Sequence, residues 1–572
     1  MTRPAGPQWT SAAAWSRHGW RIHAGAGEGT GAAGGWSGAA GGWSGAAGGW
    51  SGAAGGWTGA TIPELAAASA RRVPDRVAVS VDGQPVSHGR LDAQARQAAG
   101  WLAGRLDPGE RMLLAAGPGP GFLSWYLGAL RAGVIVVLAN PGYTQAELGH
   151  LVADSGARLA VADPGPAARL GTLAAGLPVV AAGDPPRDLP RDLPRDLPPE
   201  AGRALPAAGD IALLAYTSGT TGRPKGVPLT HRQLAASIQG AMTAWRWAGS
   251  DVLVHALPLF HQHGLGGVHA TLIAGSTAHL RSRFDPADLI ATVRAEAGTV
   301  LFGVPATYQA LLDCAAGVPS LRGLRLAVCG SAPLSPALAA RLPGLLGQLP
   351  LIRYGTTESG LDVSNPLGSA RPDTVGLPLP GVECRIWSGG GEASGGHEAP
   401  PGGDGEIQLR GPQVFQGYWN DAEATAAAFT PDGWFRTGDI GAIGPGPGPG
   451  RDSGPGHLVI RGRIKELIIS GGLNVYPREV EIALERHPSV AEAAVAGLPH
   501  PRWGEQVTAW VVPRAGATVS EAELIAHTRT LLAAYKCPKQ LFTLAALPRT
   551  PLGKLARAAL PLPRPPPPRP QP

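Results

Sequence analysis

The chain has few cysteines and no long hydrophobic run, and both absences narrow the classes of protein to which it can belong. Its 572 residues include four scattered cysteines with no Cys-x-x-Cys pair, namely Cys314, Cys329, Cys384 and Cys537. This spacing argues against a zinc site or a disulfide framework and fits a reducing compartment. The most apolar stretch, Phe122 to Ala139, is interrupted by Arg131, so we expect a buried helix and strand there and no transmembrane segment.

A strong excess of charge is also missing. The formal net charge is +6 over the whole chain, which is too weak to indicate a nucleic-acid partner. The N-terminus lacks an uninterrupted apolar stretch of the secretory type, so we predict a cytoplasmic location. Residues 1–27 carry arginines and no acid, which leaves an organellar matrix as the alternative.

Glycine and proline are abundant instead, with 84 and 57 copies, and much of the excess lies in repeats. A seven-residue Gly/Ala/Ser repeat places tryptophan at positions 36, 43, 50 and 57. One large residue per repeat makes a poor helix, so residues 1–60 are predicted to be low-complexity and disordered. Three copies of Arg-Asp-Leu-Pro within 184–199 read as a surface linker, and the Pro-rich residues 561–572 read as a tail.

The rest of the chain alternates strand-like and helix-like segments. Helical patterns over 62–72, 91–106, 122–132 and 145–155 are interleaved with apolar runs over 76–81, 112–116 and 134–139. This alternation predicts an α/β fold with largely parallel sheets covered by helices, over a large domain at 61–464. A small α+β domain is predicted at 465–560, with helices at 478–487 and 520–533 and strands at 490–496 and 506–513.

The stretch from Tyr216 to Val227 reads as a phosphate-binding loop. It follows a strand-like run, 211–215, and a helical pattern begins at Leu229. Glycines let backbone N–H groups approach an anion, hydroxyls add donors, and a lysine adds a point charge. The spacing differs from that of a Walker loop, and such a loop on its own is as often a plain surface loop. The predicted nucleotide-binding residues are Thr217, Ser218, Gly219, Thr220, Thr221, Gly222 and Lys225.

Four further stretches follow in a fixed order. They are Tyr354-Gly-Thr-Thr-Glu358, Gly433-Trp-Phe-Arg-Thr-Gly-Asp439, the run from Arg461 to Pro477, and Leu547-Pro-Arg-Thr-Pro-Leu-Gly-Lys554. Together with the Gly-rich loop they resemble the core motifs of the adenylate-forming superfamily, which includes the acyl-CoA synthetases and other AMP-dependent ligases. The resemblance covers roughly residues 62–560.

The resemblance implies a nucleotide site built from the middle motifs. Tyr354, with Gly355 and Thr356 beside it, would stack near the adenine, and Thr357 would bind the α-phosphate. Glu358 would hold Mg²⁺, a hard cation that prefers carboxylate oxygen. A second set of residues would bind the ribose and reach the nucleotide: Asp439, which can accept hydrogen bonds from both hydroxyls of a cis-diol, and Arg463.

The resemblance also implies a reaction in two halves, with ATP, Mg²⁺ and CoA as its cofactors and no nucleic acid as a partner. A small carboxylic acid attacks MgATP to give acyl-AMP and pyrophosphate, and CoA then displaces AMP. Lys554 would bridge the carboxylate and the α-phosphate in the first half. Gly471 and Gly472 would leave room for the pantetheine arm in the second, after the small domain turns about Lys465.

Two further stretches resemble family motifs, one near the entrance of the acyl pocket and one that would contribute to cofactor binding. The apolar run 252–264, read as a strand that ends in histidines, contains Leu257-Pro-Leu-Phe-His261. Its similarity to a family motif implies that His261 lines the pocket entrance, although a lone histidine is more often structural. Farther on, a strand delivers Gly330, Ser331 and Ala332, where a flat ring or an acyl chain could lie against the backbone.

The choice of acid rests on two arginines, Arg283 and Arg353. The segments around them look like those of malonyl-CoA synthetases, and a guanidinium fork suits the distal carboxylate of a short diacid. The alternative is a fatty-acyl ligase in which both arginines are surface or salt-bridged. A stand-alone adenylation domain, a luciferase-like member and a non-catalytic binding protein are further alternatives, although no Gly-Gly-x-Ser carrier site follows.

Overall fold

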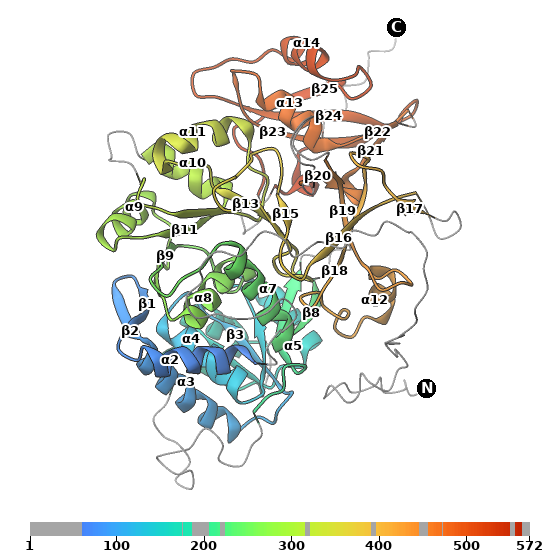
Figure 1. The fold of residues 1–572 in the computed structure, drawn as a ribbon. Helices are drawn as coiled ribbons and strands as arrows, with labels where there is room; N and C mark the ends of the chain where they lie inside the picture. The colour runs from blue at the N-terminus through green and yellow to red at the C-terminus, as the bar shows by residue number, and fades with distance from the viewer. Residues whose placement is uncertain are drawn as a thin grey trace, which may run out of the picture. The chain divides into compact units, whose positions relative to one another are not determined.

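The computed structural model describes residues 60–173, 176–185, 205–217, 224–314, 321–389, 396–444, 456–471, 473–549 and 555–562. The tryptophan repeat, the three Arg-Asp-Leu-Pro copies and most of the Pro-rich tail lie outside these residues. The chain divides into two compact units, which are described separately (Figure 1). The first comprises Met1–Ser250, Pro258–Thr277 and Phe415–Ala422, and the second comprises Asp251–Leu257, Ala278–Val414 and Glu423–Pro572.

The first unit is built on a six-stranded sheet in the order β6-β5-β3-β4-β7-β8. The first five strands in this order run parallel, which confirms the predicted α/β alternation. The central strands β3, β4 and β5 are buried on both faces, as expected for parallel strands covered by helices, whereas the edge strand β6 is partly exposed. The strands are β3 (Arg111–Ala115), β4 (Ile135–Leu138), β5 (Leu159–Ala162), β6 (Val179–Ala181), β7 (Ile211–Thr217) and β8 (Lys225–Thr230).

Three helices of the first unit begin at a threonine that caps them. Thr61, Thr144 and Thr230 each form a reciprocal capping box with the Glu or Gln three residues later. Two of the helices pack so closely that a Cβ at Gly128 would lie 2.4 Å from the Cβ of Ala98. The helices are α2 (Ile62–Arg72), α3 (His88–Ala103), α4 (Pro120–Arg131), α5 (Gln145–Ser155), α6 (Pro164–Gly171), α7 (His231–Ala244) and α8 (Gln262–Ala274), and a hairpin of β1 (Val77–Val81) and β2 (Gln84–Ser87) accompanies them.

Two predictions for the segments around residues 229–264 were wrong. The helical pattern expected from Leu229 begins only at His231, because the preceding residues form β8, antiparallel to β7. Pro228 is tolerated in β8 because this strand is the edge of its sheet. The strand expected over 252–264 ends at His255 as β9 (Val252–His255), and His261 is the N-cap of α8.

The second unit contains a run of parallel strands in the order β13-β12-β11-β9. β14 and β15 extend it as antiparallel strands beyond β13, and β10 lies beyond β9. The strands are β10 (Thr277–Leu280), β11 (Val300–Gly303), β12 (Leu326–Cys329), β13 (Leu351–Tyr354), β14 (Val363–Ser364) and β15 (Leu377–Pro378), and the helices are α9 (Pro286–Ala295), α10 (Pro305–Cys314) and α11 (Pro336–Leu346).

An antiparallel five-stranded sheet follows in the order β17-β16-β18-β19-β20. Its last two strands carry the predicted ribose-binding motif and the start of the predicted hinge. The elements are β16 (Glu383–Ser388), β17 (His397–Glu398), β18 (Gly405–Arg410), α12 (Ala422–Ala428), β19 (Phe435–Ile443) and β20 (Leu458–Arg463).

The C-terminal part of the chain is a small α+β layer with its own core. Valines and leucines from one face of its sheet pack against two helices. The sheet order is β22-β21-β24-β23, and β25 pairs in parallel with β24. The elements are η1 (Ile464–Glu466), β21 (Ile468–Ser470), β22 (Leu473–Val475), α13 (Pro477–Glu485), β23 (Val490–His500), β24 (Gly504–Pro513), α14 (Glu521–Leu531), β25 (Gln540–Thr543) and η2 (Arg557–Ala559). Within the described ranges of the chain, no helix has the length and apolar character needed to cross a membrane.

Candidate active site

The predicted phosphate loop is flanked by the antiparallel strands β7 and β8. Thr217 and Lys225 are paired across its base, and the predicted residues Ser218, Gly219, Thr220, Thr221 and Gly222 lie outside the described residues. The β7 end is fixed because the Tyr216 hydroxyl donates a 2.7 Å hydrogen bond to Asp154. Burial and the negative charge of Asp154 raise the pKa of Tyr216, which keeps the phenol in its donating form.

Lys225 is held by the segment Phe415–Ala422. Its Nζ lies 3.6 Å from the carboxylate of Asp421 and 5.0 Å from the centre of the Tyr418 ring. A Cβ at Gly226 would lie 2.9 Å from the Cβ of Trp419, so the glycine is needed for this close packing. The sequence reading missed Tyr418 and Asp421, for which only their place in an aromatic, turn-like Tyr-Trp-Asn-Asp run was a signal.

The motif from Tyr354 to Glu358 is a tight loop between β13 and β14. A Cβ on Gly355 would lie 2.0 Å from the carbonyl oxygen of Gly360, so no other residue fits without moving the backbone. The loop closes through a 2.8 Å hydrogen bond from the Gly360 N–H to the Thr356 carbonyl. Thr357 and Glu358, the predicted phosphate and Mg²⁺ ligands, lie half-buried between these two points.

The buried side chain of Asp362 stabilises this loop through hydrogen bonds. Its carboxylate accepts hydrogen bonds from Ser359 Oγ at 2.5 Å and from Gln413 Nε2 at 3.0 Å, and the Thr356 N–H also donates to it. Ser359 Oγ lies 2.9 Å from Thr356 Oγ1, so the carboxylate reaches both ends of the turn that carries Thr357. Burial raises the pKa of Asp362 to about 7 in spite of these donors.

The structure brings together three residues that the motifs named separately. The hydroxyl of Tyr354 donates to one oxygen of Asp439 at 2.7 Å, and Nε of Arg463 lies 3.0 Å from the other. Asp439 and Arg463 are directly opposite in the antiparallel pair β19–β20, so the strand register sets this contact. The charge of Asp439 raises the pKa of Arg463, and burial together with Asp439 raises the pKa of Tyr354.

Asp439 is therefore a nearly buried acceptor beside an accessible cation. The Asp439 side chain is 6% exposed, whereas that of Arg463 is 58% exposed. A carboxylate presents two acceptor oxygens side by side, which is the arrangement that the two hydroxyls of a cis-diol require. In addition to any stacking of its ring, Tyr354 orients the carboxylate of Asp439 through its hydroxyl group.

The strand β12 ends in the small residues that the sequence singled out. Gly330 is buried and donates a 3.3 Å hydrogen bond to the Gly303 carbonyl, and Ala332 is half-buried. Ser331 has φ +67°, a left-handed conformation that is uncommon outside glycine. Such strained conformations are frequent at ligand sites, and Asp82, Arg246, Ala297 and Asn420 share a positive φ in this chain.

The predicted histidine and arginines have different environments. His261 caps α8 through Nδ1, which accepts the His263 N–H at 3.3 Å, and His263 is buried. Arg283 is exposed after β10. Arg353 on β13 is half-buried, and its Nε is sealed from solvent with no hydrogen-bond partner within the described ranges. Burial lowers the pKa of Arg353 to about 10, although the charge of Asp362 opposes this shift.

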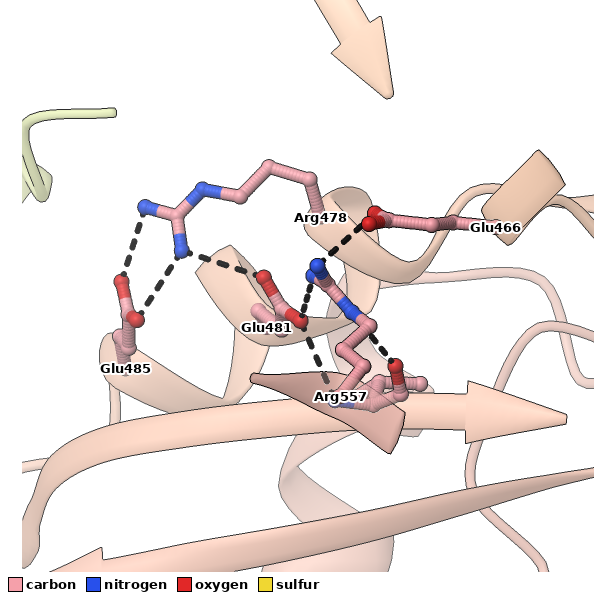
Figure 2. A network of polar contacts seen from close by, with 6 residues as sticks. Glu466, Arg478, Glu481, Glu485 and Arg557 are labelled. Atoms are coloured by element: carbon pink, nitrogen blue, oxygen red, sulfur yellow. Dashed lines mark hydrogen bonds and ion pairs between the residues drawn. The ribbon is translucent and has the colours of Figure 1, made fainter. Parts of the chain in front are cut away.

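The predicted hinge and CoA-facing residues lie at the start of the small layer. Lys465 is exposed in η1, and Gly471 has φ +61° at the turn between β21 and β22. Gly472 and Lys554 lie outside the described residues. The sequence reading also missed a network of arginines and glutamates on the same layer, formed by Glu466, Arg478, Glu481, Glu485 and Arg557 (Figure 2).

Glu358 suits Mg²⁺ that binds together with nucleotide phosphates, and the described residues do not form a metal site made of protein side chains alone. Among the described residues, no group of three or more His, Cys, Asp or Glu side chains could enclose a metal. A single carboxylate is the protein contribution expected when Mg²⁺ arrives on nucleotide phosphates and keeps most of its waters.

Comparison with known proteins agrees with the motif order. The model of the "AMP-binding enzyme" family matches residues 66–419, and that of the "AMP-binding enzyme C-terminal domain" matches residues 479–554. The chain is 37% identical over 511 residues to a feruloyl-CoA synthase of Amycolatopsis sp, covering 85% of this chain and 96% of that protein.

Two further proteins are similar to the chain. A mitochondrial malonate–CoA ligase of Mus musculus is 38% identical over 382 residues, covering 61% of this chain and 64% of that protein. The crystal structure of ATP-bound MatB from Rhodopseudomonas palustris superposes with a TM-score of 0.78 at 34% identity, covering 88% of this chain and 98% of that chain.

Proposed function

The chain belongs to the AMP-binding enzyme family and is an AMP-forming acyl-CoA synthetase, and we propose that its substrate is a short dicarboxylic acid of the malonate type. The observation that carries this choice is the environment of Arg353. Its guanidinium is partly cut off from water, and its Nε has no hydrogen-bond partner in the described ranges. Burying an arginine in this way is costly unless an acid compensates it.

Asp362 alone does not compensate the positive charge of Arg353. Asp362 raises the pKa of Arg353, but burial still lowers it to about 10, and the pKa of Asp362 itself is raised to about 7. A distal carboxylate that binds at Arg353 would supply the missing negative charge. Similarity to a malonate–CoA ligase supports the same choice, whereas similarity to a feruloyl-CoA synthase supports an aromatic acid as the rival.

The first half-reaction follows from charge. The carboxylate attacks the α-phosphorus of ATP, the bond to the β-phosphate breaks, and pyrophosphate leaves. Lys225 and Lys554 offset the crowded negative charge, Thr357 binds the α-phosphate, and Asp439 fixes the ribose. Glu358 would hold Mg²⁺, which neutralises phosphate charge when bound. In this proposal His261 borders the acyl group, and Gly330, Ser331 and Ala332 lie against the adenine ring or the acyl chain.

In the second half-reaction the thiol of CoA occupies the place near the acyl group that Lys554 takes in the first. The CoA thiolate attacks the acyl carbon and AMP leaves as its phosphate anion, so a thioester replaces a mixed anhydride. The small domain turns about Lys465 between the halves, and Gly471 with Gly472 borders the pantetheine arm.

The test is AMP release that depends on both ATP and CoA, measured across malonate, methylmalonate, oxalate, acetate, octanoate and ferulate. We expect selective turnover of the diacids. Arg353→Gln should lower kcat/KM for malonate about 30-fold or more, from the loss of a charged hydrogen bond worth about 2 to 3 kcal/mol, while acetate turnover changes little. Arg283→Gln, at an exposed site, should lower it less.

Arg294→Gln is the matched control, because Arg294 is an exposed arginine on α9 and the charge change is the same. The ratio of malonate to acetate turnover separates loss of acid recognition from loss of folded protein. Preference for octanoate or ferulate in the wild-type enzyme, or an unchanged ratio in Arg353→Gln, would refute the diacid proposal.

A further inference from the structure

A buried carboxylate, Glu481 of α13, is the centre of the polar network in the C-terminal layer (Figure 2). It is 2% exposed and accepts the backbone N–H of Val495 on β23 at 3.1 Å. Two guanidinium groups also bind it, those of Arg478 and Arg557. The acid therefore ties a helix, a strand and the segment η2 together.

Arg557 extends this network to the hinge. One terminal nitrogen binds Glu481, the other donates to Glu466 at 2.8 Å, and Nε donates to the Val495 carbonyl at 3.2 Å. Three of its N–H directions are thus used on three different elements, as the planar fork of arginine allows and a lysine does not. Its side chain is 21% exposed, so water screens these contacts only partly.

The two ends of this contact are close in sequence to residues of the proposed mechanism. Glu466 ends η1, directly after the hinge residue Lys465. Arg557 follows Lys554 by three positions. Described residues on either side of Lys554 are held as well: Arg549 pairs with Glu492 at 2.6 Å, and the Pro548 carbonyl accepts the Ala556 N–H at 2.9 Å.

We propose that Arg557 is a positioning residue that clamps Glu466 to the body of the small domain and so confines the turn between half-reactions to Lys465. The proposal rests on the proposed function, because it deepens the role given there to the hinge. When Arg557 binds Glu466, this residue moves with α13 and β23 as one body, and Lys554 returns to the same place in each catalytic cycle. Without this contact, the flexible hinge extends past Glu466, and Lys554 is positioned less accurately.

The variants are Arg557→Gln, Arg557→Lys, Glu466→Gln and the double variant Arg557→Gln/Glu466→Gln. Pyrophosphate exchange reports the first half-reaction, and thioester formation from supplied acyl-AMP reports the second. We expect Arg557→Gln to slow the exchange about 10- to 100-fold, the effect of a misplaced catalytic group, and the second half-reaction less than about threefold. Glu466→Gln should act in the same direction, and the double variant should add little because the two side chains share one contact.

Arg478→Gln is the matched control, because Arg478 binds the same Glu481 and also Glu485 but, among the described residues, forms no ion pair with Glu466. It should destabilise the layer without favouring one half-reaction. Hydrogen exchange gives a readout besides activity: the Leu467 N–H, bonded to the Ile464 carbonyl at 3.3 Å, should exchange faster in Arg557→Gln than in Arg478→Gln.

These measurements test the proposed role of Arg557 separately from the proposed function of the enzyme. If the wild-type enzyme fails to exchange pyrophosphate with any acid, the proposed function fails, and the Leu467 exchange rate still decides the clamp. The clamp is overturned if Arg557→Gln leaves that rate unchanged, or if Arg478→Gln slows adenylation as selectively as Arg557→Gln does.

Discussion

Asp362 should titrate near neutral pH, and this can be measured by replacing it with asparagine. The side chain is 0% exposed, and burial raises its pKa from the ordinary value of 3.8 to about 7. Asparagine keeps the shape and removes the charge. Its amide can donate to Gln413 once that side chain rotates, because Oε1 of Gln413 has no hydrogen-bond partner in the described ranges.

The sign and the size of the effect follow from linkage. A carboxyl whose pKa is raised by folding binds its proton more tightly in the folded state, so its contribution to stability is full below pH 4 and is lost as the pH rises to about 7. A shift from 3.8 to about 7 corresponds to about 4 kcal/mol in total. The free-energy difference, wild type minus Asp362→Asn, should therefore fall by about 1.4 kcal/mol per pH unit up to pH 7 and stay flat above it.

Urea unfolding of both proteins at pH 5, 6, 7 and 8 measures this difference, and groups shared by the two proteins cancel from it. Arg353, with a pKa of about 10, stays charged throughout this range. A difference that does not change with pH, or that rises with pH, would refute the reasoning. It would mean that Ser359, Gln413 and Arg353 hold the carboxylate ionised at every pH tested.

Three further substitutions test the nucleotide site. Lys554→Ala should abolish adenylation while leaving thioester formation from supplied acyl-AMP largely intact, and equal survival of both half-reactions would remove Lys554 from the mechanism. Asp439→Asn should raise KM for ATP about 10- to 100-fold through the loss of charged hydrogen bonds worth about 1.5 to 3 kcal/mol each, and an unchanged KM would contradict the ribose assignment. Gly355→Ala should cut adenylation about 100-fold, because its Cβ would lie 2.0 Å from the Gly360 carbonyl oxygen; a fully active variant would show that the loop can relax.

Much of the α/β alternation could be predicted from the sequence, because helices and parallel strands leave strong local patterns. The helix Ile62–Arg72 and the strand β4 lie where periodicity put them. Edge effects were harder to predict. Pro228 argues against a strand unless the strand is known to be an edge, and that depends on the sheet order.

The candidate site was also only partly predictable from the sequence. Motif likeness named Tyr354, Asp439 and Arg463, but only the register of β19 and β20 and the position of β13 bring them into one cluster. Asp362 was missed because a lone acid in a sequence is usually a solvated one. Arg557 was missed because its partners Glu466 and Glu481 are 91 and 76 residues away.

The most direct test of the account is the search for an acyl-AMP intermediate. The purified protein is incubated with malonate and MgATP in the absence of CoA, and the nucleotides are resolved by mass spectrometry. We predict that malonyl-AMP and pyrophosphate form in equal amounts, and that adding CoA converts the adenylate into malonyl-CoA and AMP. Formation of ADP and an acyl phosphate, or of the thioester with no adenylate in its path, would contradict the account.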